Sequence, residues 1–162
     1  MDAGDRNSWH RDQDERPLSD LGRRQADAIA AALTEEYEID ALFASTALRA
    51  KETLWPLAEG LGLPVQIEPL LCEKQLGEST VDLGERGLRA VQAIRAAVGQ
   101  AIAVAASHGD LIPATVGALN SALHRAPADA SSVQLWRSRW YEIVLGEHDI
   151  GVTLREATNF PL

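Results

Sequence analysis

Residues 101–110, AIAVAASHGD, constrain the fold of this chain more than any other segment. Ala101–Ala106 is an apolar run of small and β-branched side chains without polar alternation, which is typical of a strand covered on both faces in a parallel sheet. A Ser-His-Gly-Asp turn follows at 107–110, and then a helical pattern at Leu111–Leu123 in which Pro113 falls in the first turn. The segment therefore predicts a buried strand, a turn that carries a histidine, and a helix.

The rest of the chain repeats this alternation of helix and strand signals. Helices are expected at Asp20–Glu36, from near Thr46 to Leu61, and at Gly84–Val98, and strands at Ile39–Ser45, Val65–Glu68, Ser132–Arg137, Trp140–Leu145 and Ile150–Leu154. The connections between the last strands are too short for crossovers, so this end is expected to be antiparallel. The order predicts an α/β fold, a three-layer α/β/α sandwich with a mostly parallel mixed sheet and antiparallel strands at the C-terminal end.

Local signals refine these helices. Ser19 is the expected N-cap of the first helix. Pro56 is expected to kink or interrupt the second helix, and residues 72–80 to form a surface loop. The buried face of the first helix is expected to carry Leu21, Ala28, Ile29, Ala32 and Leu33.

Composition excludes several classes of protein. The 162 residues, 46% of them hydrophobic, suffice for a single domain spanning 1–162. With 24 acidic and 15 basic residues the net charge is −9, which argues against binding to nucleic acid or to a membrane. The sequence has no long apolar run, its first residues are charged, Cys72 is its one cysteine, and no metal-ligand spacing is present. We expect a cytoplasmic protein without disulfides or a bound metal.

Two strand-to-helix junctions carry groups suited to an anion. Arg49 follows the first, at Ser45-Thr46-Ala47-Leu48, where a hydroxyl pair is expected to cap the next helix. His108 lies in the second, where Gly109 is expected to permit a tight turn and close approach of a ligand. Ligands of such sheets bind outside the carboxyl ends of the strands, so Arg49 and His108 would converge on one anion if the junctions are neighbours.

Each of these residues also has an ordinary structural interpretation. An arginine in the first turn of a helix is more often a solvated charge, and a histidine at a strand end is more often a hydrogen-bonded structural residue. Glu73 would by itself be a common loop carboxylate. The order of the motifs along the chain favours the functional interpretation.

Taken in order, the motifs resemble those of the histidine phosphatase superfamily, the phosphoglycerate mutase-like proteins, and most of all its compact phosphohistidine-phosphatase-like branch. The resemblance covers nearly the whole chain. It rests on Arg16-Pro17-Leu18-Ser19-x-x-Gly22-x-x-Gln25-Ala26, Ser45-x-x-x-Arg49-x-x-x-Thr53, Leu71-x-Glu73-x-x-x-Gly77 and Ser107-His108-Gly109-Asp110.

The resemblance implies a mechanism and a set of roles. In the family, a histidine in an N-terminal Arg-His-Gly or Arg-His-Ala motif attacks phosphorus and forms a phosphohistidine that water hydrolyses. By this resemblance Arg49 and His108 would hold the phosphoryl oxygens and Glu73 would donate a proton, which makes these three the expected catalytic residues. Ser107 and Gly109, with Arg49 and His108, are the expected phosphate-binding residues, and Arg6 is expected to reach the same pocket. No cofactor is implied.

The N-terminal motif itself is missing, together with the family's first strand. Related domains carry Arg-His-Ala-x-Ala-Gly-x-Arg, whereas this chain begins Met1-Asp2-Ala3-Gly4-Asp5-Arg6, so Met1 falls just after the position of the attacking histidine. One hypothesis is a truncation or a misplaced start, with an upstream segment that supplies the strand and the Arg-His pair. The alternative is a non-catalytic phospholigand-binding or regulatory domain that retains the anion pocket.

The expected substrate is a phosphomonoester or a phosphohistidine on a protein. Between Glu73 and Ala101 the third helix uses most of the chain, so there is no room for the lid insertion of mutase-type relatives. The open pocket that follows favours a phosphatase over a mutase. The expected partner is thus a phosphorylated small molecule or a phosphoprotein, and the sequence predicts no oligomeric state.

Overall fold

The computed structural model describes residues 1–122, 139–145 and 150–156. Its helices and strands follow the predicted order: α1 (Asp20–Glu36), β1 (Ala41–Ala44), α2 (Leu48–Leu61), β2 (Val65–Ile67), α3 (Thr80–Val98), β3 (Ala103–Ala106), α4 (Leu111–Ala122), β4 (Arg139–Leu145) and β5 (Ile150–Glu156). Short 3-10 turns lie between them: η1 (Arg6–Ser8), η2 (Gln13–Glu15) and η3 (Pro69–Leu71). The strand predicted at Ser132–Arg137 lies outside the described residues.

The strands form a parallel sheet and an antiparallel hairpin. The parallel sheet has the order β2-β1-β3, and β1 pairs with β3 up to Ala44 opposite Ala106. β4 and β5 pair antiparallel, as predicted for the C-terminal end. Where the sequence predicts one mixed sheet, these two groups of strands form separate sheets in the part of the chain that the structure describes. β3 ends the parallel sheet on one side, and Ala105 is therefore exposed instead of covered on both faces.

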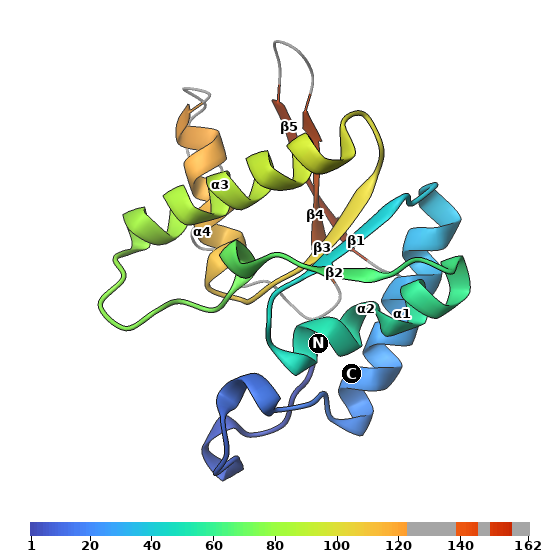
Figure 1. Ribbon diagram of the computed structural model, residues 1–162, viewed down its shortest axis with the longest axis vertical. Coiled ribbons are helices and arrows are strands. Elements are labelled where there is room, and N and C mark those ends of the chain that lie inside the picture. Colours follow the sequence, from blue (N-terminus) through green and yellow to red (C-terminus); the bar gives the residue numbers. More distant parts are fainter. Residues whose placement is uncertain (123–138, 146–149, 157–162) are drawn as a thin grey trace.

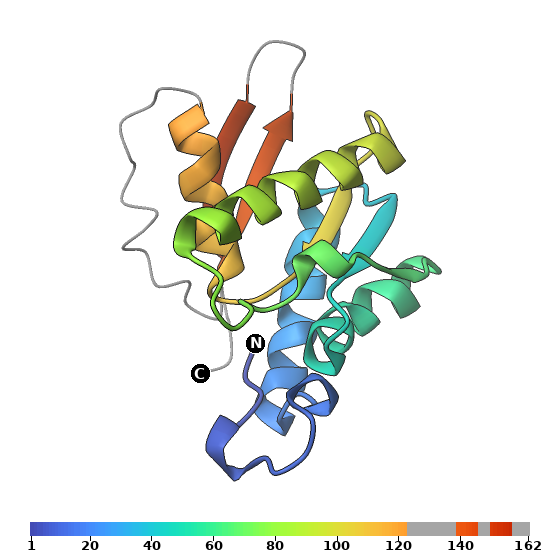
Figure 2. The same ribbon diagram turned by 60° about the vertical axis from the view of Figure 1, so that its left-hand side comes forward.

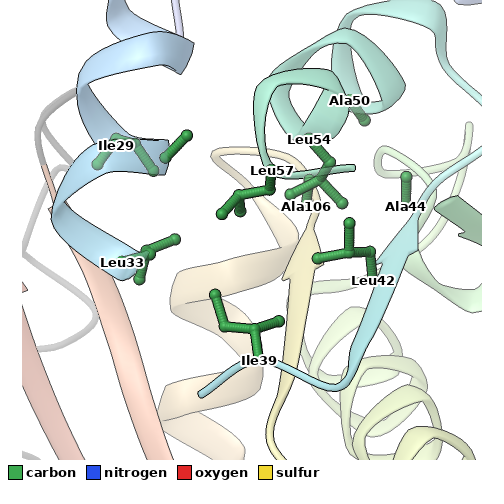
Figure 3. Packing of buried hydrophobic residues seen from close by; sticks show 10 residues of the cluster. Ile29, Leu33, Ile39, Leu42, Ala44, Ala50, Leu54, Leu57 and Ala106 are labelled. Carbon is green, nitrogen blue, oxygen red and sulfur yellow. The ribbon is translucent and has the colours of Figure 1, made fainter. Parts of the chain in front are cut away.

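Two helices cover each face of the parallel sheet, so the predicted three-layer arrangement is confirmed. Figure 1 shows α1 and α2 on one side of the strands and α3 and α4 on the other, and Figure 2 shows the same layers from a second direction. Successive side chains of β1 point to opposite faces. Leu42 and Ala44 pack with Ile29, Leu33, Leu54 and Leu57, as Figure 3 shows, while Ala41 and Phe43 pack with Leu71, Leu83, Ala90 and Leu111.

The helix boundaries confirm some predictions and correct others. α1 runs as predicted, with the Ser19 hydroxyl accepting the Gly22 amide at 3.0 Å. α2 begins after Ala47 without a side-chain cap, so the predicted hydroxyl cap is wrong, and it continues through Pro56 to Leu61. Pro56 therefore does not interrupt α2.

The third helix is longer than predicted. α3 begins at Thr80 instead of Gly84, because Ser79 and Asp82 form a capping box in which each side chain accepts the other's backbone N–H. The predicted loop at 72–80 is correspondingly shorter. Further along, Gly87 lies against Thr115 of α4 so closely that a Cβ atom would overlap the threonine side chain. This glycine lets α3 and α4 pack directly against each other.

The buried face of α1 is rotated from the one that apolar spacing predicts. Its buried residues are Gly22, Gln25, Ala26, Ile29, Ala30 and Leu33. Gln25 is buried because its side-chain oxygen accepts the Asp2 amide at 2.8 Å, and the Asp2 carbonyl accepts the Ser19 amide at 3.0 Å. The first residues of the chain are thus fixed across the start of α1, and Met1 is partly buried against the core cluster that contains Leu42.

None of the helices in the described ranges combines the length and apolar character needed to cross a membrane.

Candidate phosphate-binding site

The parallel pairing of β1 and β3 brings the two predicted junctions together. Ser45 follows β1 and Ser107-His108 follows β3, so both junctions lie at the carboxyl edge of the sheet. The Ser45 hydroxyl lies 2.8 Å from His108 Nε2, and an Arg49 terminal nitrogen lies 3.2 Å from His108 Nδ1. The structure therefore places Arg49 and His108 in contact at the edge of the sheet where ligands of α/β proteins bind.

These contacts define the protonation of His108. A guanidinium group can only donate hydrogen bonds, so the contact with Arg49 requires Nδ1 to accept. Nε2 then carries the proton and donates it to the Ser45 hydroxyl, which gives a neutral ring. Burial lowers the pKa of His108, and the positive charge of Arg49 lowers it further. These contacts and the lowered pKa favour the neutral form of His108, which is buried with 7% exposure.

Arg49 has a partner on each side of the site. One terminal nitrogen donates to the Gln13 carbonyl at 2.7 Å, and the other to Glu73 at 3.1 Å as well as to His108. Its side chain is 11% exposed. Arg49 lies in the first turn of α2, so the backbone amides at that end of the helix are close by. The guanidinium group and these amides both favour a negative charge.

Glu73 lies between two arginines. One carboxylate oxygen accepts from Arg49 and the other accepts from Arg6 at 3.0 Å. The predicted residues Arg6, Arg49, Glu73 and His108 are therefore one connected group. Arg6 reaches it from the N-terminal segment and remains 60% exposed.

Ser107 and Gly109 flank this group without joining its hydrogen bonds. The Ser107 hydroxyl donates to the Leu71 carbonyl at 2.8 Å, which ties the end of β3 to the segment before Glu73. Gly109 does not have a positive φ, and the space where a Cβ would lie is empty. The backbone of this turn therefore does not require a glycine. Asp110 accepts the amides of Lys74 and Leu111, each at 2.8 Å, and so joins the Glu73 loop to the start of α4.

Arg16 is a site residue that the motif analysis does not assign. Its guanidinium donates to the carbonyls of Ala3 and Gly4 at 2.7 and 3.2 Å and to the side chain of Gln13 at 3.1 Å. Burial lowers its pKa, and the charge of Arg49 lowers it further while Glu73 opposes this. Its place in the Arg-Pro-Leu-Ser motif was the signal that marks it.

The residues described here include no cluster of three or more histidine, cysteine, aspartate or glutamate side chains that could hold a metal ion. Cys72 is a free thiol that lies 3.3 Å from the Thr46 hydroxyl, which itself donates to Asp14 at 3.0 Å. The charged groups that act on His108 are thus Arg49 and the carboxylates of Glu73, Asp110 and Asp14, and Arg6 pairs with Glu73. The two arginines of this set are suited to an anion with several oxygen atoms.

Fold and site together define an α/β protein with a group of arginine, glutamate and histidine side chains at the carboxyl edge of its parallel strands. Residues 4–79 match the sequence model of the histidine phosphatase superfamily (branch 1), a range that includes Arg6, Arg49 and Glu73. Over this range the chain is similar to that superfamily, in agreement with the resemblance of the motifs.

Individual relatives are phosphatases. The 8-oxo-(d)GTP phosphatase of Mycolicibacterium smegmatis is 38% identical over 72 residues, which are 44% of this chain and 22% of that protein, so the match spans about a fifth of its length. A mycobacterial glucosyl-3-phosphoglycerate phosphatase complexed with VO3 has a TM-score of 0.70 at 22% identity, over 89% of this chain and 88% of its own. A phosphoserine phosphatase from Entamoeba histolytica, in complex with 3-phosphoglyceric acid, has a TM-score of 0.72 at 15% identity, over 90% and 87%. At these identities the solved structures establish a shared fold.

Proposed function

We propose that this protein is a phosphoric monoester hydrolase of the histidine phosphatase type, acting on an accessible phosphomonoester or on protein phosphohistidine. The observation that carries the proposal is the contact of Arg49 and His108 at the carboxyl edge of β1 and β3, with Glu73 and Arg6 beside them. Phosphoryl transfer requires mainly positioning and neutralisation of charge on the phosphoryl oxygens. An arginine pair and a histidine at this edge meet that requirement.

Each residue has a role in the proposed reaction. Arg49 and Arg6 neutralise the phosphoryl oxygens, and His108 binds one of them, a bond that favours the protonated ring. Ser107 and Gly109 lie along the same turn and would contact the phosphoryl group from the β3 side. Glu73 is the proposed proton donor to the leaving oxygen.

His108 is poorly placed to act as the nucleophile. Its Nε2 proton is donated to Ser45, and its Nδ1 lone pair accepts from Arg49, so neither nitrogen is free to attack phosphorus. In the proposed reaction a nitrogen of another histidine attacks phosphorus. The bond from phosphorus to the leaving oxygen breaks as that oxygen takes a proton from Glu73. Water then attacks the phosphohistidine and gives a proton to the Glu73 carboxylate, which releases phosphate and restores both the histidine and the protonated Glu73.

We propose that this attacking histidine is supplied by a segment upstream of Met1. Two features of the structure support such a segment. Met1 packs against the core, so a preceding residue would already be at the sheet. β3 is the last strand of the parallel sheet among the described residues, and its outer edge would accept a further strand.

The second candidate is a non-catalytic domain that binds a phosphorylated ligand. It is favoured by the fact that the described residues supply the anion-binding groups and no free nucleophilic histidine at the site. The two candidates differ in turnover and agree in phosphate binding, so one set of measurements separates them.

The experiment compares this chain with an upstream-extended form in hydrolysis of p-nitrophenyl phosphate and in phosphate binding by calorimetry. Extension should raise turnover by several orders of magnitude, since loss of a reacting group typically costs that much. His108→Ala and Arg49→Ala should reduce turnover of the extended form and phosphate binding of both forms. Phosphate binding without turnover in either form would support the non-catalytic alternative, and absence of phosphate binding would contradict both candidates.

A further inference from the structure

The carboxylate of Glu73 occupies the arginines to which a phosphoryl group would bind. Its two oxygens lie 3.1 Å from Arg49 and 3.0 Å from Arg6, so each arginine of the pocket is engaged by one oxygen. This bridging arrangement resembles the way in which two oxygens of a phosphate would engage the same two guanidinium groups.

Both terminal nitrogens of Arg49 already have partners. The nitrogen that binds Glu73 also contacts His108, and the other donates to the Gln13 carbonyl. A phosphoryl oxygen that binds the nitrogen beside His108 must replace one of its two partners, since that nitrogen carries two N–H groups. Glu73 is the partner that a second anion would repel, because two negative charges a few ångströms apart cost free energy that the neutral Gln13 carbonyl does not.

The side chain of Glu73 can leave without a change in the backbone. Its carbonyl is held by Arg86 at 3.3 Å and by the Gln75 side chain at 2.8 Å, which fix the main chain at this point. The carboxylate is 29% exposed, and its partner Arg6 is 60% exposed. The open pair with Arg6 contributes little to stability, whereas the Arg49 side chain is 11% exposed, so its contact with Glu73 is exchanged at small cost only for another anion.

We propose that Glu73 is a resident counter-anion of the pocket, which an incoming phosphoryl group displaces from Arg49 and Arg6. The inference rests on the proposed function and extends it, because displacement links two events. Binding of the phosphoryl group releases the Glu73 carboxylate from the arginines, so that it takes up a proton from solvent and becomes the proposed proton donor only when a substrate is present. Glu73 thus weakens ground-state binding of phosphate while it keeps the arginines paired and ordered in the empty site.

The test measures binding of inorganic phosphate to the chain by calorimetry at constant ionic strength. Glu73→Gln removes the charge at nearly unchanged shape and should tighten phosphate binding about tenfold, which corresponds to about 1.4 kcal/mol. Glu73→Asp has a shorter side chain that cannot bridge both arginines, and it should give an intermediate affinity. The matched control is Glu85→Gln, which removes an exposed carboxylate from α3 and should leave the affinity unchanged.

Several outcomes separate the inference from the function on which it rests. Phosphate binding that depends on Arg49 but is equal or weaker in Glu73→Gln would overturn the displacement of Glu73 and leave the proposed function standing. An equal gain in Glu85→Gln would reduce the effect to net charge and would also overturn it. Absence of phosphate binding in all variants would overturn both. Should Glu73→Gln unfold, the side-chain carboxyl carbon of Glu73 in the unmodified chain provides the readout, since its NMR shift should move as phosphate binds and stay fixed if Glu73 is not displaced.

Discussion

The backbone carbonyl of Asp2 occupies the space that a side chain at Gly22 would fill. A Cβ atom at position 22 would lie far inside van der Waals contact with this carbonyl. The same carbonyl accepts the Ser19 amide, and the Asp2 amide donates to Gln25. Gly22 and Gln25 of the first motif therefore hold the beginning of the chain, and through it the segment that carries Arg6.

Gly22→Ala should displace residues 1–3 from the start of α1. We expect a loss of about 1–3 kcal/mol in the free energy of unfolding, as for other overpacked sites. Faster hydrogen exchange at the Ser19 amide should show that the damage begins there, and phosphate should bind more weakly because Arg6 is no longer held near Glu73. Gly117→Ala is the matched control, since a Cβ at Gly117 in α4 meets empty space and should stabilise the helix. Unchanged exchange at Ser19 in Gly22→Ala would contradict this account.

Arg86 of α3 fixes the loop that presents Glu73. Its guanidinium pairs with Glu78 and donates to the carbonyls of Leu70, Cys72 and Glu73. Arg86→Met should lower stability, because it removes the partner of the Glu78 carboxylate and the donor to three backbone carbonyls. Thermal unfolding measures this, with the exposed Arg89→Met as control. Equal melting temperatures for the two variants would show that Arg86 does not hold the loop.

The pairing of Glu78 with Arg86 also predicts a dependence of stability on pH. The hydrogen bond from the Arg86 side chain, with a further one from the Gln75 backbone, lowers the pKa of Glu78 from 4.5 to about 2. Because the folded pKa lies below the unfolded one, the contribution to stability is complete above about pH 4.5 and is lost as the pH falls toward 2. Unfolding in denaturant at several pH values between 2 and 6 should show this decline, and Glu78→Gln should flatten it. An equally steep decline in Glu78→Gln would refute the assignment.

His108 should act on stability at higher pH. Burial and the charge of Arg49 lower its pKa from the ordinary 6.5, so the unfolded chain binds a proton more readily than the folded one below that pH. Stability should therefore decrease as the pH falls below about 6.5. NMR titration of the imidazole should give a midpoint below 6.5 in the empty site and a higher one with phosphate bound. A midpoint that phosphate leaves unchanged would indicate that the imidazole does not contact the anion.

The regular part of the fold could be predicted from the sequence because periodicity and caps are local. Apolar spacing and the Ser19 cap predict the helix at Asp20–Glu36, and apolar patterns predict the starts of β2 at Val65 and of α4 at Leu111. The structure confirms all three. Long-range contacts decided what local signals could not. Gln25 is buried because Asp2, distant in sequence, needs an acceptor for its amide.

The starts of α2 and α3 differ from the prediction for different reasons. The hydroxyl cap of α2 was predicted from residue types, but the Ser45 hydroxyl is used by His108 and the Thr46 hydroxyl by Asp14. The early start of α3 followed from the capping box of Ser79, a local signal that could have been used. The convergence of Arg49 and His108 could be anticipated from parallel pairing alone, whereas the contact of Arg16 with the N-terminal segment depends on the folded path of residues 1–15.

Arg16 should control the affinity of the pocket by holding the N-terminal segment. Its planar group donates to the carbonyls of Ala3 and Gly4 and to Gln13, a set that the single ammonium group of lysine cannot reproduce. Arg16→Lys keeps the charge and loses this geometry, so a weakening of phosphate binding by about fivefold, or about 1 kcal/mol, would be due to loosening of the segment and not to lost charge.

The same variant should raise hydrogen exchange in residues 3–8, which a role in direct charge attraction would not do. Arg11→Lys is the matched control, because Arg11 is exposed and makes only a distant ion pair with Glu15 at 4.0 Å. If Arg16→Lys binds phosphate as tightly as the unmodified chain while Arg16→Ala binds it weakly, the charge of Arg16 is what the pocket requires. If Arg16→Lys is as weak as Arg16→Ala, then the path of the N-terminal segment is what determines where Arg6 lies relative to Glu73.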